Sequence, residues 1–304
     1  MSESRRSHFA PVLQALLVTF LWSTSWVLIK FGLDDIPALT FAGLRYTIAF
    51  LVLAVIVLSS KELRLSIVSL SRAGWWQLVA LGLIFYTLTQ GAMFVALEHL
   101  PAISLTLILS FTPAAVALMA IPWLGERPRR IQWVGMFLFL FGVVIYFAPF
   151  EVSMPMAGLV AGLTCLLANA VSTLMGRAIN RRQDLHPLVV TVISMGVGSL
   201  GLLTIGLSTQ GLPSLDRGNW SIIVWLAVVN TALAFTLWNH TQRRLTAVES
   251  SIINNTMTVQ IAVLAWLFLG ETLDAKGLWG LSLAVVGALL AQLPTGEPKD
   301  QKAE

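Results

Sequence analysis

Long runs of apolar residues, separated by short polar segments, cover almost the whole of this chain. A helix needs about 20 mostly apolar residues to cross the hydrocarbon core of a bilayer. By that criterion the sequence predicts ten membrane-spanning helices, at residues 11–31, 37–59, 75–97, 101–124, 131–149, 155–177, 187–208, 219–241, 247–269 and 276–293. We therefore expect an all-α integral membrane protein. The first run follows Arg5 and Arg6, but its length and the lack of a small-residue cleavage pattern predict a retained helix rather than a signal peptide.

The composition supports this class and excludes others. Hydrophobic residues make up 57% of the chain and charged residues 11%, with a mean hydropathy of +0.81, values far from those of a soluble domain. Cys165 is the single cysteine, so no intramolecular disulfide forms, and no Cys/His cluster has the spacing of a metal site. We expect neither a metal nor a cofactor. The basic residues stand in short clusters between apolar runs, which is typical of membrane topology rather than of nucleic-acid binding.

The positions of the basic residues predict the orientation. Short cytoplasmic loops are enriched in Lys and Arg. If both termini lie in the cytoplasm, all but four of the 19 basic residues fall on that side, the exceptions being Lys30, Arg45, Arg217 and Lys276. A missed or invented helix would reverse this pattern in every later loop. The sequence thus favours ten spans with both ends inside.

A tripeptide that occurs twice indicates an internal repeat. Leu124-Gly125-Glu126 superposes on Leu269-Gly270-Glu271 after a shift of 145 positions, and a shared register of this kind is the signature of a duplication. The same shift also superposes Leu100 on Leu245, Ala102 on Ala247, Gly135 on Gly280, Leu138 on Leu283 and Gly142 on Gly287. We expect two five-helix repeats, residues 1–150 and 151–304. Because five is odd, the second repeat would enter the membrane inverted, which is a recurrent construction of secondary transporters.

The motifs resemble those of a known family. Leu100-Pro101-Ala102, Thr112-Pro113 and Leu124-Gly125-Glu126-Arg127 in the first half, and Trp238-Asn239, Arg243-Arg244-Leu245 and Leu269-Gly270-Glu271 in the second, are similar to the EamA-type repeat of the drug/metabolite transporter superfamily. The resemblance covers nearly the whole chain. It implies a ten-helix transporter, commonly an exporter of amino acids or other small metabolites, whose central cavity is lined by helices 1, 3, 4, 6, 8 and 9.

Two positions depart from the family pattern. Thr258 replaces the proline that would match Pro113, and it lies in the polar run Asn254-Asn255-Thr256-Met257-Thr258-Val259-Gln260. Ser23 replaces the glycine of a Trp-Gly pair, a small-for-small change that still permits close helix packing. A pocket beside the polar run should therefore be rich in hydrogen-bonding groups.

Polar and indole side chains at membrane depth are the candidate substrate ligands, because a polar group facing lipid is costly unless it is paired or lines a cavity. The candidates are Trp22, Trp26, Lys30, Tyr86, Gln90, Ser110, Asn169, Asn230, Trp238, Asn254, Asn255 and Thr258. Alternatives stay open for many of them. The tryptophans suit a membrane interface, Lys30 suits a snorkelling end charge, and the serines and threonines suit hydrogen bonds between helices.

The charged groups leave further questions open. Arg45 lies about eight residues inside its helix, where it either pairs with Asp34 or Asp35 of the nearby loop or binds an anion. No Asp or Glu lies at mid-depth and His240 falls near a helix end, so the sequence does not establish proton coupling. We interpret Glu126 and Glu271 as helix-end or gate residues rather than as substrate ligands.

The sequence bears on three functional classes. A transporter of small amphiphilic metabolites, amino acids in the first place, accounts for the inverted repeat and the midplane amides together. A membrane enzyme would need a Ser/His/Asp set or a His-Glu-x-x-His helix, and neither is present in the sequence. A channel, lipid-scrambling or scaffold role is the alternative to transport. The expected setting is a bacterial inner membrane, with a small-molecule substrate and the lipid bilayer as partners, no nucleic acid, and a homodimer left open.

Overall fold

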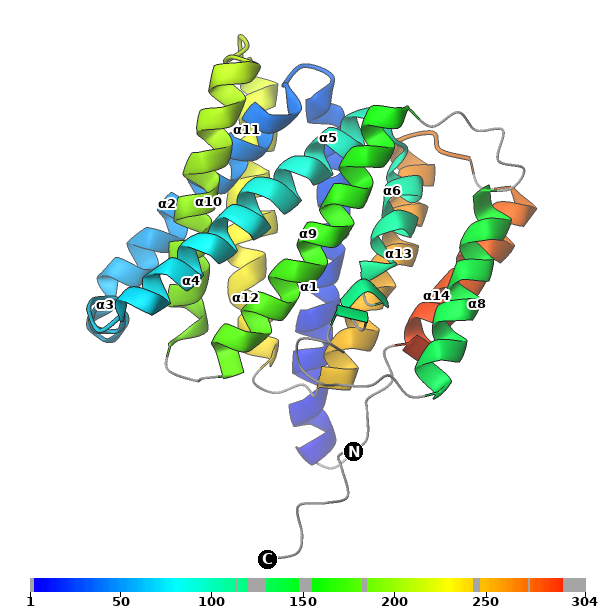
Figure 1. Cartoon of the computed structure of the whole chain (residues 1–304), viewed down its shortest axis with the longest axis horizontal. Helices are drawn as coiled ribbons and strands as arrows, with labels where there is room; N and C mark the ends of the chain where they lie inside the picture. Colours follow the sequence, from blue (N-terminus) through cyan, green and yellow to red (C-terminus); the bar gives the residue numbers. More distant parts are fainter. Residues whose placement is uncertain are drawn as a thin grey trace, which may run out of the picture.

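The computed structural model describes residues 3–112, 114–116, 118–119, 130–147, 155–181, 185–242, 247–272 and 274–291. The regular structure in these ranges is helical, and the helices lie side by side in one bundle (Figure 1). Six helices are long and apolar enough to cross a membrane, namely Ala10–Leu33, Ala38–Ser59, Arg72–His99, Met156–Gly176, Pro187–Thr209 and Arg217–Trp238. Four more apolar helices are shorter, at Ala102–Val116, Trp133–Tyr146, Thr256–Phe268 and Ala275–Leu290. The protein is therefore an α-helical membrane protein.

A helix lies at each of the ten segments that hydropathy singled out, although residues 113, 117 and 120–124 of the fourth, 148–149 of the fifth and 292–293 of the tenth fall outside the described ranges. The elements are α1 (Glu3–Leu33), α2 (Ala38–Ser59), α3 (Lys61–Val68), α4 (Arg72–Gly82), η1 (Leu83–Gln90), α5 (Gly91–His99), α6 (Ala102–Leu109), α8 (Arg130–Phe147), α9 (Met156–Arg181), α10 (Pro187–Thr209), α11 (Arg217–Ala227), η2 (Val228–Leu233), α12 (Ala234–Gln242), α13 (Ala247–Phe268) and α14 (Ala275–Ala291). The third and eighth predicted segments are each composed of three consecutive elements.

Prolines and side-chain caps set the starts of several helices. α2 and α6 begin directly after Pro37 and Pro101, and α10 begins at Pro187. Proline suits these positions because its fixed φ fits the helix and its missing N–H has no intrahelical partner there. α11 begins after Asp216, whose carboxylate accepts a hydrogen bond from the Asn219 N–H at 2.7 Å. Such caps satisfy N–H groups that the first turn leaves free.

The short helix α3 was not predicted. It begins after Ser60, whose hydroxyl oxygen accepts from the Leu63 N–H at 3.4 Å, and it connects α2 to α4 across one end of the bundle (Figure 1). Leu65 and Val68 are 60% and 82% exposed. Eight residues are too few to span a membrane, so hydropathy at that scale did not reveal this helix.

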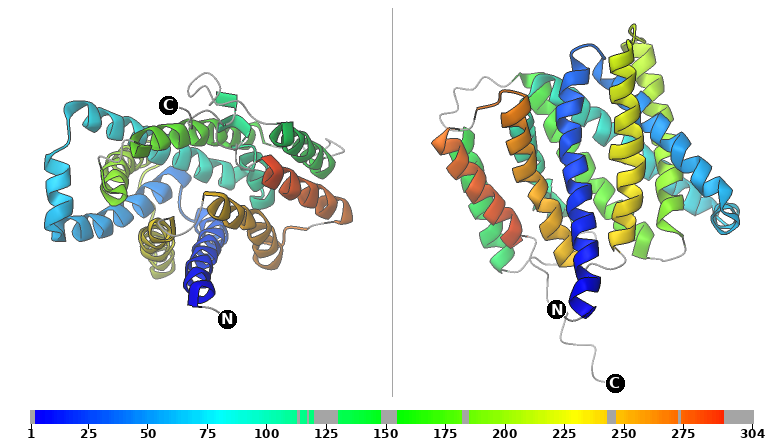
Figure 2. Two further views of the ribbon diagram at one scale, coloured as in Figure 1. Left: turned by 90° about the horizontal axis from the view of Figure 1, so that it is seen from below. Right: turned by 180° about the vertical axis from the view of Figure 1, so that it is seen from behind.

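Glycines allow α8 and α14 to pack backbone to backbone at one edge of the bundle (Figures 1 and 2). A Cβ atom placed on Gly142 would lie 2.6 Å from the Gly280 carbonyl oxygen, and one placed on Gly287 would lie 2.7 Å from the Gly135 carbonyl oxygen. These are the four glycines that the repeat pairs, Gly135 with Gly280 and Gly142 with Gly287. The contacts are therefore reciprocal: each half presents the same two glycines to the other.

A second close pair lies at the opposite edge, where α2 packs against α10. A Cβ atom on Gly43 would lie 2.5 Å from Leu203 Cα, and one on Gly206 would lie 2.6 Å from the Thr40 nitrogen. Between these two pairs lie α1, α9, α12 and α13 (Figure 1). The buried core, which includes Phe41 and Phe94, therefore lies inside a bundle closed at both edges by small residues.

Two helices contain a widened turn at equivalent positions. The segments η1 and η2 have π-helical geometry, and their first residues, Leu83 and Val228, are 145 positions apart, the same shift as between the two Leu-Gly-Glu tripeptides. In each segment a threonine hydroxyl donates to the carbonyl oxygen five residues earlier, Thr89 to Ile84 and Thr231 to Leu226, both at 2.8 Å. Such π turns are rare and often mark functional sites.

Candidate functional site

The two indoles Trp22 and Trp238 come together between α1 and α12. Their ring centroids lie 5.2 Å apart, and Trp22 also lies 5.5 Å from the ring of Phe235. Both tryptophans are half-buried. Trp26, one turn further along α1, is 8% exposed and belongs to the main core. Two residues chosen separately from the sequence thus form one aromatic cluster.

Two amide side chains, Asn230 of η2 and Gln260 of α13, form hydrogen bonds with α1. From η2, the fully buried Asn230 donates through Nδ2 to the Leu21 carbonyl oxygen and to Thr24 Oγ1. From α13, Gln260 accepts a hydrogen bond from Ser23 Oγ at 2.9 Å. The serine that replaces the family's glycine therefore supplies a hydrogen bond between helices. Gln260 is not among the predicted ligands, although it belongs to the polar run 254–260.

Tyr86 and Gln90 meet a tyrosine of α2. The Tyr46 hydroxyl donates to Gln90 Oε1 at 2.6 Å, and the rings of Tyr46 and Tyr86 lie 5.5 Å apart. Tyr86 is 2% exposed. Both predicted residues lie within η1, so this π segment carries a polar cluster in the interior of the bundle.

Arg45, next to Tyr46 in α2, contacts the other π segment. Its Nε donates to Thr231 Oγ1 at 3.1 Å. The guanidinium carbon lies 5.2 Å from the Tyr46 ring centroid and 5.9 Å from that of Phe94, within the range of cation–π attraction. Within the described residues no ion pair joins Arg45 to Asp34 or Asp35, the loop acids weighed as partners from the sequence. The Asp35 carboxylate instead accepts from Asn219 Nδ2 at 3.4 Å.

The other predicted ligands are more dispersed. Ser110 is half-buried and its hydroxyl donates to the Thr106 carbonyl oxygen at 2.8 Å, Asn169 and Thr258 are half-buried, and Asn254 is exposed. The side chain of Asn255 and the whole of Pro113 lie outside the described residues. No contact described here joins these residues to the aromatic cluster.

The second Leu-Gly-Glu copy ends one helix and caps another. Gly270 has φ of 66°, the left-handed conformation that commonly follows a helix and that glycine adopts without strain. The next residue, Glu271, accepts hydrogen bonds from the Ala102 and Ile103 N–H groups at 2.6 and 3.0 Å. A carboxylate at a helix N-terminus satisfies free N–H groups and opposes the helix dipole. The helix-end role predicted for Glu271 is therefore confirmed, whereas Glu126 lies outside the described residues.

Lys30 lies in an acidic environment at the same end of the bundle. It interacts electrostatically with Glu271, and more weakly with Asp34 and Glu98. The side chain is half-buried at the last turn of α1. Three carboxylates of the protein therefore attract its charge, although burial of the side chain is the larger electrostatic effect.

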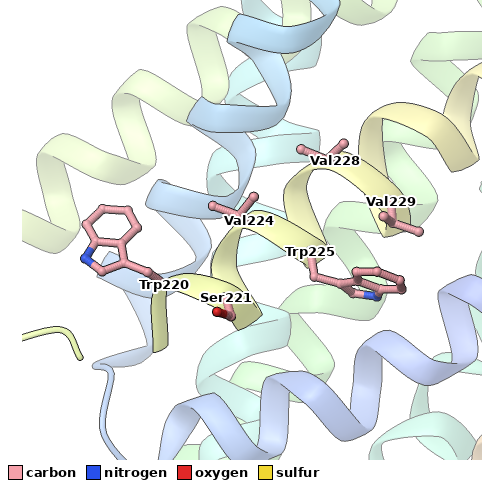
Figure 3. Close-up of a pocket in the computed structure, with 6 residues that line it drawn as sticks. All are labelled: Trp220, Ser221, Val224, Trp225, Val228 and Val229. Atoms are coloured by element: carbon pink, nitrogen blue, oxygen red, sulfur yellow. The ribbon is translucent and has the colours of Figure 1, made fainter. Parts of the chain in front are cut away.

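A surface hollow of about 540 Å³ lies elsewhere, on α11 and η2. Figure 3 shows its lining side chains, Trp220, Ser221, Val224, Trp225, Val228 and Val229. Trp220 and Trp225 are 43% and 53% exposed, and none of the predicted ligands lines this hollow. An exposed apolar face of this kind suits contact with lipid. Within the described residues, no group of three or more His, Cys, Asp or Glu side chains could hold a metal ion.

Comparison with known proteins agrees with this arrangement. One solved crystal structure superposes with a TM-score of 0.67 at 20% identity, over 94% of this chain and 98% of the other, so the fold is shared. Similar proteins include the uncharacterized transporter YvbV of Bacillus subtilis, 29% identical over 73% of this chain and 69% of the relative. The pseudopaline exporter CntI of Pseudomonas aeruginosa is 26% identical, over 91% of this chain and 94% of the relative.

A third relative is named as a probable amino-acid metabolite efflux pump, from Salmonella typhimurium, and is 27% identical over 90% of this chain and 91% of the relative. The model of the EamA-like transporter family matches this chain twice, over residues 10–148 and 156–293. The two matches together cover most of the sequence. The chain therefore belongs to the EamA-like transporter family.

Proposed function

We propose that this protein is a secondary transporter that exports small amphiphilic metabolites, amino acids in the first place, by alternating access. Two inverted five-helix repeats, residues 1–150 and 151–304, would form ten membrane spans with both termini in the cytoplasm. The host membrane would be a bacterial inner membrane. Alternating access in such proteins consists largely of one unit rocking against the other around a central site.

The observation that carries this proposal is the reciprocal glycine contact of α8 and α14. If two copies of one unit are related by a two-fold axis, a contact from the first residue to the second must recur from the second to the first. Gly142 with Gly280 and Gly287 with Gly135 fit this rule. The equivalent positions of η1 and η2, and the two separate family matches, give further support.

The interior side chains support an amphiphilic substrate. The indoles of Trp22 and Trp238, the phenol of Tyr86 and the amide of Gln90 would offer broad apolar surfaces with a few hydrogen-bonding groups, as small-molecule sites do. We keep the other predicted ligands, Trp26 and Asn255 among them, as further members of this site. The names of two relatives, a pseudopaline exporter and a probable amino-acid metabolite efflux pump, favour the same substrate class.

Counterflow in proteoliposomes tests the proposal. Vesicles are preloaded with unlabelled amino acids or related metabolites, and uptake of the labelled counterparts is followed in the wild type and in Trp22→Ala. The control is Trp220→Ala, which alters an exposed tryptophan on the surface hollow. We expect saturable exchange that is lost in Trp22→Ala and kept in Trp220→Ala. Flux that neither saturates nor is competed by unlabelled solute would favour the channel or scaffold alternative.

The proposed topology has a separate test. Cys165 is buried, so a cysteine introduced at an exposed position can be labelled selectively. In intact cells, a membrane-impermeant maleimide should label Ser214→Cys, between α10 and α11, and should spare Ser69→Cys, beyond α3, until the cells are lysed. Labelling of Ser69→Cys but not of Ser214→Cys in intact cells would show that the topology is the inverse of the proposed one.

A further inference from the structure

Arg45 is a buried cation with unused hydrogen-bonding capacity. It is 4% exposed in the core-facing part of α2. The Arg45 Nε donates a hydrogen bond to Thr231 Oγ1, whereas the Arg45 Nη1 is buried without a hydrogen-bond partner. A cation inside a membrane bundle costs several kcal/mol unless a counter-charge or polar partners compensate it. The described residues leave this guanidinium only partly compensated.

The contrast with Lys30 makes Arg45 the better anion site. The sequence offered these two cations as groups that could reach a buried anion. Lys30 has Glu271, Asp34 and Glu98 around it. Among the described residues, Arg45 instead contacts two aromatic rings and one hydroxyl group. An incoming anion would compete with protein carboxylates at Lys30, but it would supply the missing counter-charge at Arg45.

The geometry suits a single carboxylate. A guanidinium presents several N–H donors in a plane, which match the two oxygens of a carboxylate. The rings of Tyr46 and Phe94 next to the guanidinium favour an organic acid over a strongly hydrated ion such as a phosphate ester, which needs several cations. A carboxylate bound at Arg45 would thus supply both the counter-charge and the acceptors that the guanidinium lacks.

We propose that Arg45 binds the carboxylate of the transported substrate. This inference rests on the proposed transport function and narrows its substrates to carboxylates, α-amino acids first. Because Arg45 belongs to residues 1–150 and Thr231 to residues 151–304, the site lies where the two proposed repeats meet. A bound carboxylate would therefore contact groups whose relative positions change as the repeats move.

Ligand-induced thermal stabilisation tests the inference without requiring transport. The detergent-purified protein is unfolded while its tryptophan fluorescence is recorded, in the presence of L-amino acids, simple monocarboxylates, and amines that lack only the carboxylate, such as phenethylamine against L-phenylalanine. We expect some acids to raise the unfolding midpoint, and their amine counterparts to bind at least about tenfold more weakly, since a charge-assisted bidentate contact is lost. Equal stabilisation by acids and amines, or none by any acid, would overturn the inference.

Variants of Arg45 give a second, independent readout. Arg45→Gln should lose the stabilisation by acids, and Arg45→Lys should weaken it about tenfold because the ammonium lacks the planar fork. Arg64→Gln, which alters an exposed arginine of α3, should behave as the wild type. If Arg45→Gln does not fold, Arg45→Lys and the acid–amine comparison in the wild type still test whether Arg45 binds the carboxylate. Stabilisation by acids that persists in Arg45→Gln or is unchanged in Arg45→Lys would contradict the assignment.

Further outcomes distinguish binding of the substrate carboxylate from binding of chloride, and failure of this inference from failure of the proposed transport function. Chloride could supply the same counter-charge, so the assay is repeated in chloride-free sulfate buffer. If chloride raises the unfolding midpoint of the wild type but not of Arg45→Gln, and no acid raises it, the substrate assignment would be overturned. Acids that bind through Arg45 without counterflow of any solute would refute the proposed transport function and leave Arg45 as an anion site. Counterflow that does not distinguish acids from amines would refute the inference and leave transport intact.

Discussion

Alanine at Gly142 or Gly287 should push α8 and α14 apart. A Cβ atom on Gly142 would lie 2.5 Å from the backbone nitrogen of Ala284, and ordinary contact begins at 3.4 Å. The helices would have to separate by about 0.9 Å at this point, because backbone atoms cannot turn aside as the tip of a side chain can. Overpacking of this kind typically costs about 1–3 kcal/mol. The same reasoning applies to Gly287, whose added Cβ would lie 2.7 Å from the Gly135 carbonyl oxygen.

Gly176 provides the matched control. It lies inside α9, and an added Cβ would meet no atom within 4 Å. Gly→Ala within a helix gains about 0.5–1 kcal/mol from the backbone alone, and this gain is common to all three variants. The difference between Gly142→Ala and Gly176→Ala therefore isolates the overpacking cost, about 1–3 kcal/mol.

The assay is the unfolding midpoint of the purified protein in detergent. Gly142→Ala and Gly287→Ala should both unfold at lower temperature than Gly176→Ala, and by similar amounts because their contacts are reciprocal. Midpoints equal to that of Gly176→Ala would refute the close packing of α8 on α14. A loss in one variant only would refute the reciprocity from which we inferred two related repeats.

Three further predictions use the same assay. Glu271→Gln should lower stability by about 1–2 kcal/mol because the cap of α6 loses its charge, whereas Glu98→Gln, which changes an exposed carboxylate that interacts only weakly with Lys30, should lower it less; equal effects would contradict the capping role. Trp22→Ala and Trp238→Ala should show a coupling of about 0.5–1.5 kcal/mol in a double-mutant cycle, as expected for a ring pair, and strict additivity would argue against their contact. Gln260→Leu should cost about 0.5–1.5 kcal/mol because the hydrogen bond between α13 and Ser23 of α1 is lost while the Ser23 hydroxyl keeps the Thr19 carbonyl oxygen as acceptor, and an unchanged midpoint would show that the bond to Gln260 contributes nothing.

Hydropathy predicted the positions of the long helices because the bilayer demands apolar runs of a fixed length. It could not predict η1 and η2, since a π turn leaves the composition of a run unchanged. The sequence did contain the glycines of the α8–α14 contact, as repeat markers. Their shared shift indicated a duplication, but nothing in the residues alone said that the two copies touch each other.

The candidate site was predicted in part. Trp22 and Trp238 were chosen one by one as indoles at membrane depth, and their contact arises only from the packing of α1 on α12. For Arg45 the sequence suggested the nearest loop acids, Asp34 and Asp35. Its hydrogen-bonding partner is Thr231, 186 positions away, a hydroxyl that no local pattern could associate with this arginine. Long-range pairing of polar groups is the information that a single sequence lacks.

The pairing of α8 with α14 also has a consequence for biosynthesis. α14 is the last described helix, so Gly142 is made about 140 residues before Ala284, the residue it packs against. At ordinary rates of translation this interval lasts on the order of 10 s. Throughout it, if α8 spans the bilayer as in the proposed topology, its glycine face is open to lipid or to another protein. The edge of the bundle closes only once α14 has been made, which makes the newly made α8 the exposed surface that an insertion factor or a membrane protease would encounter.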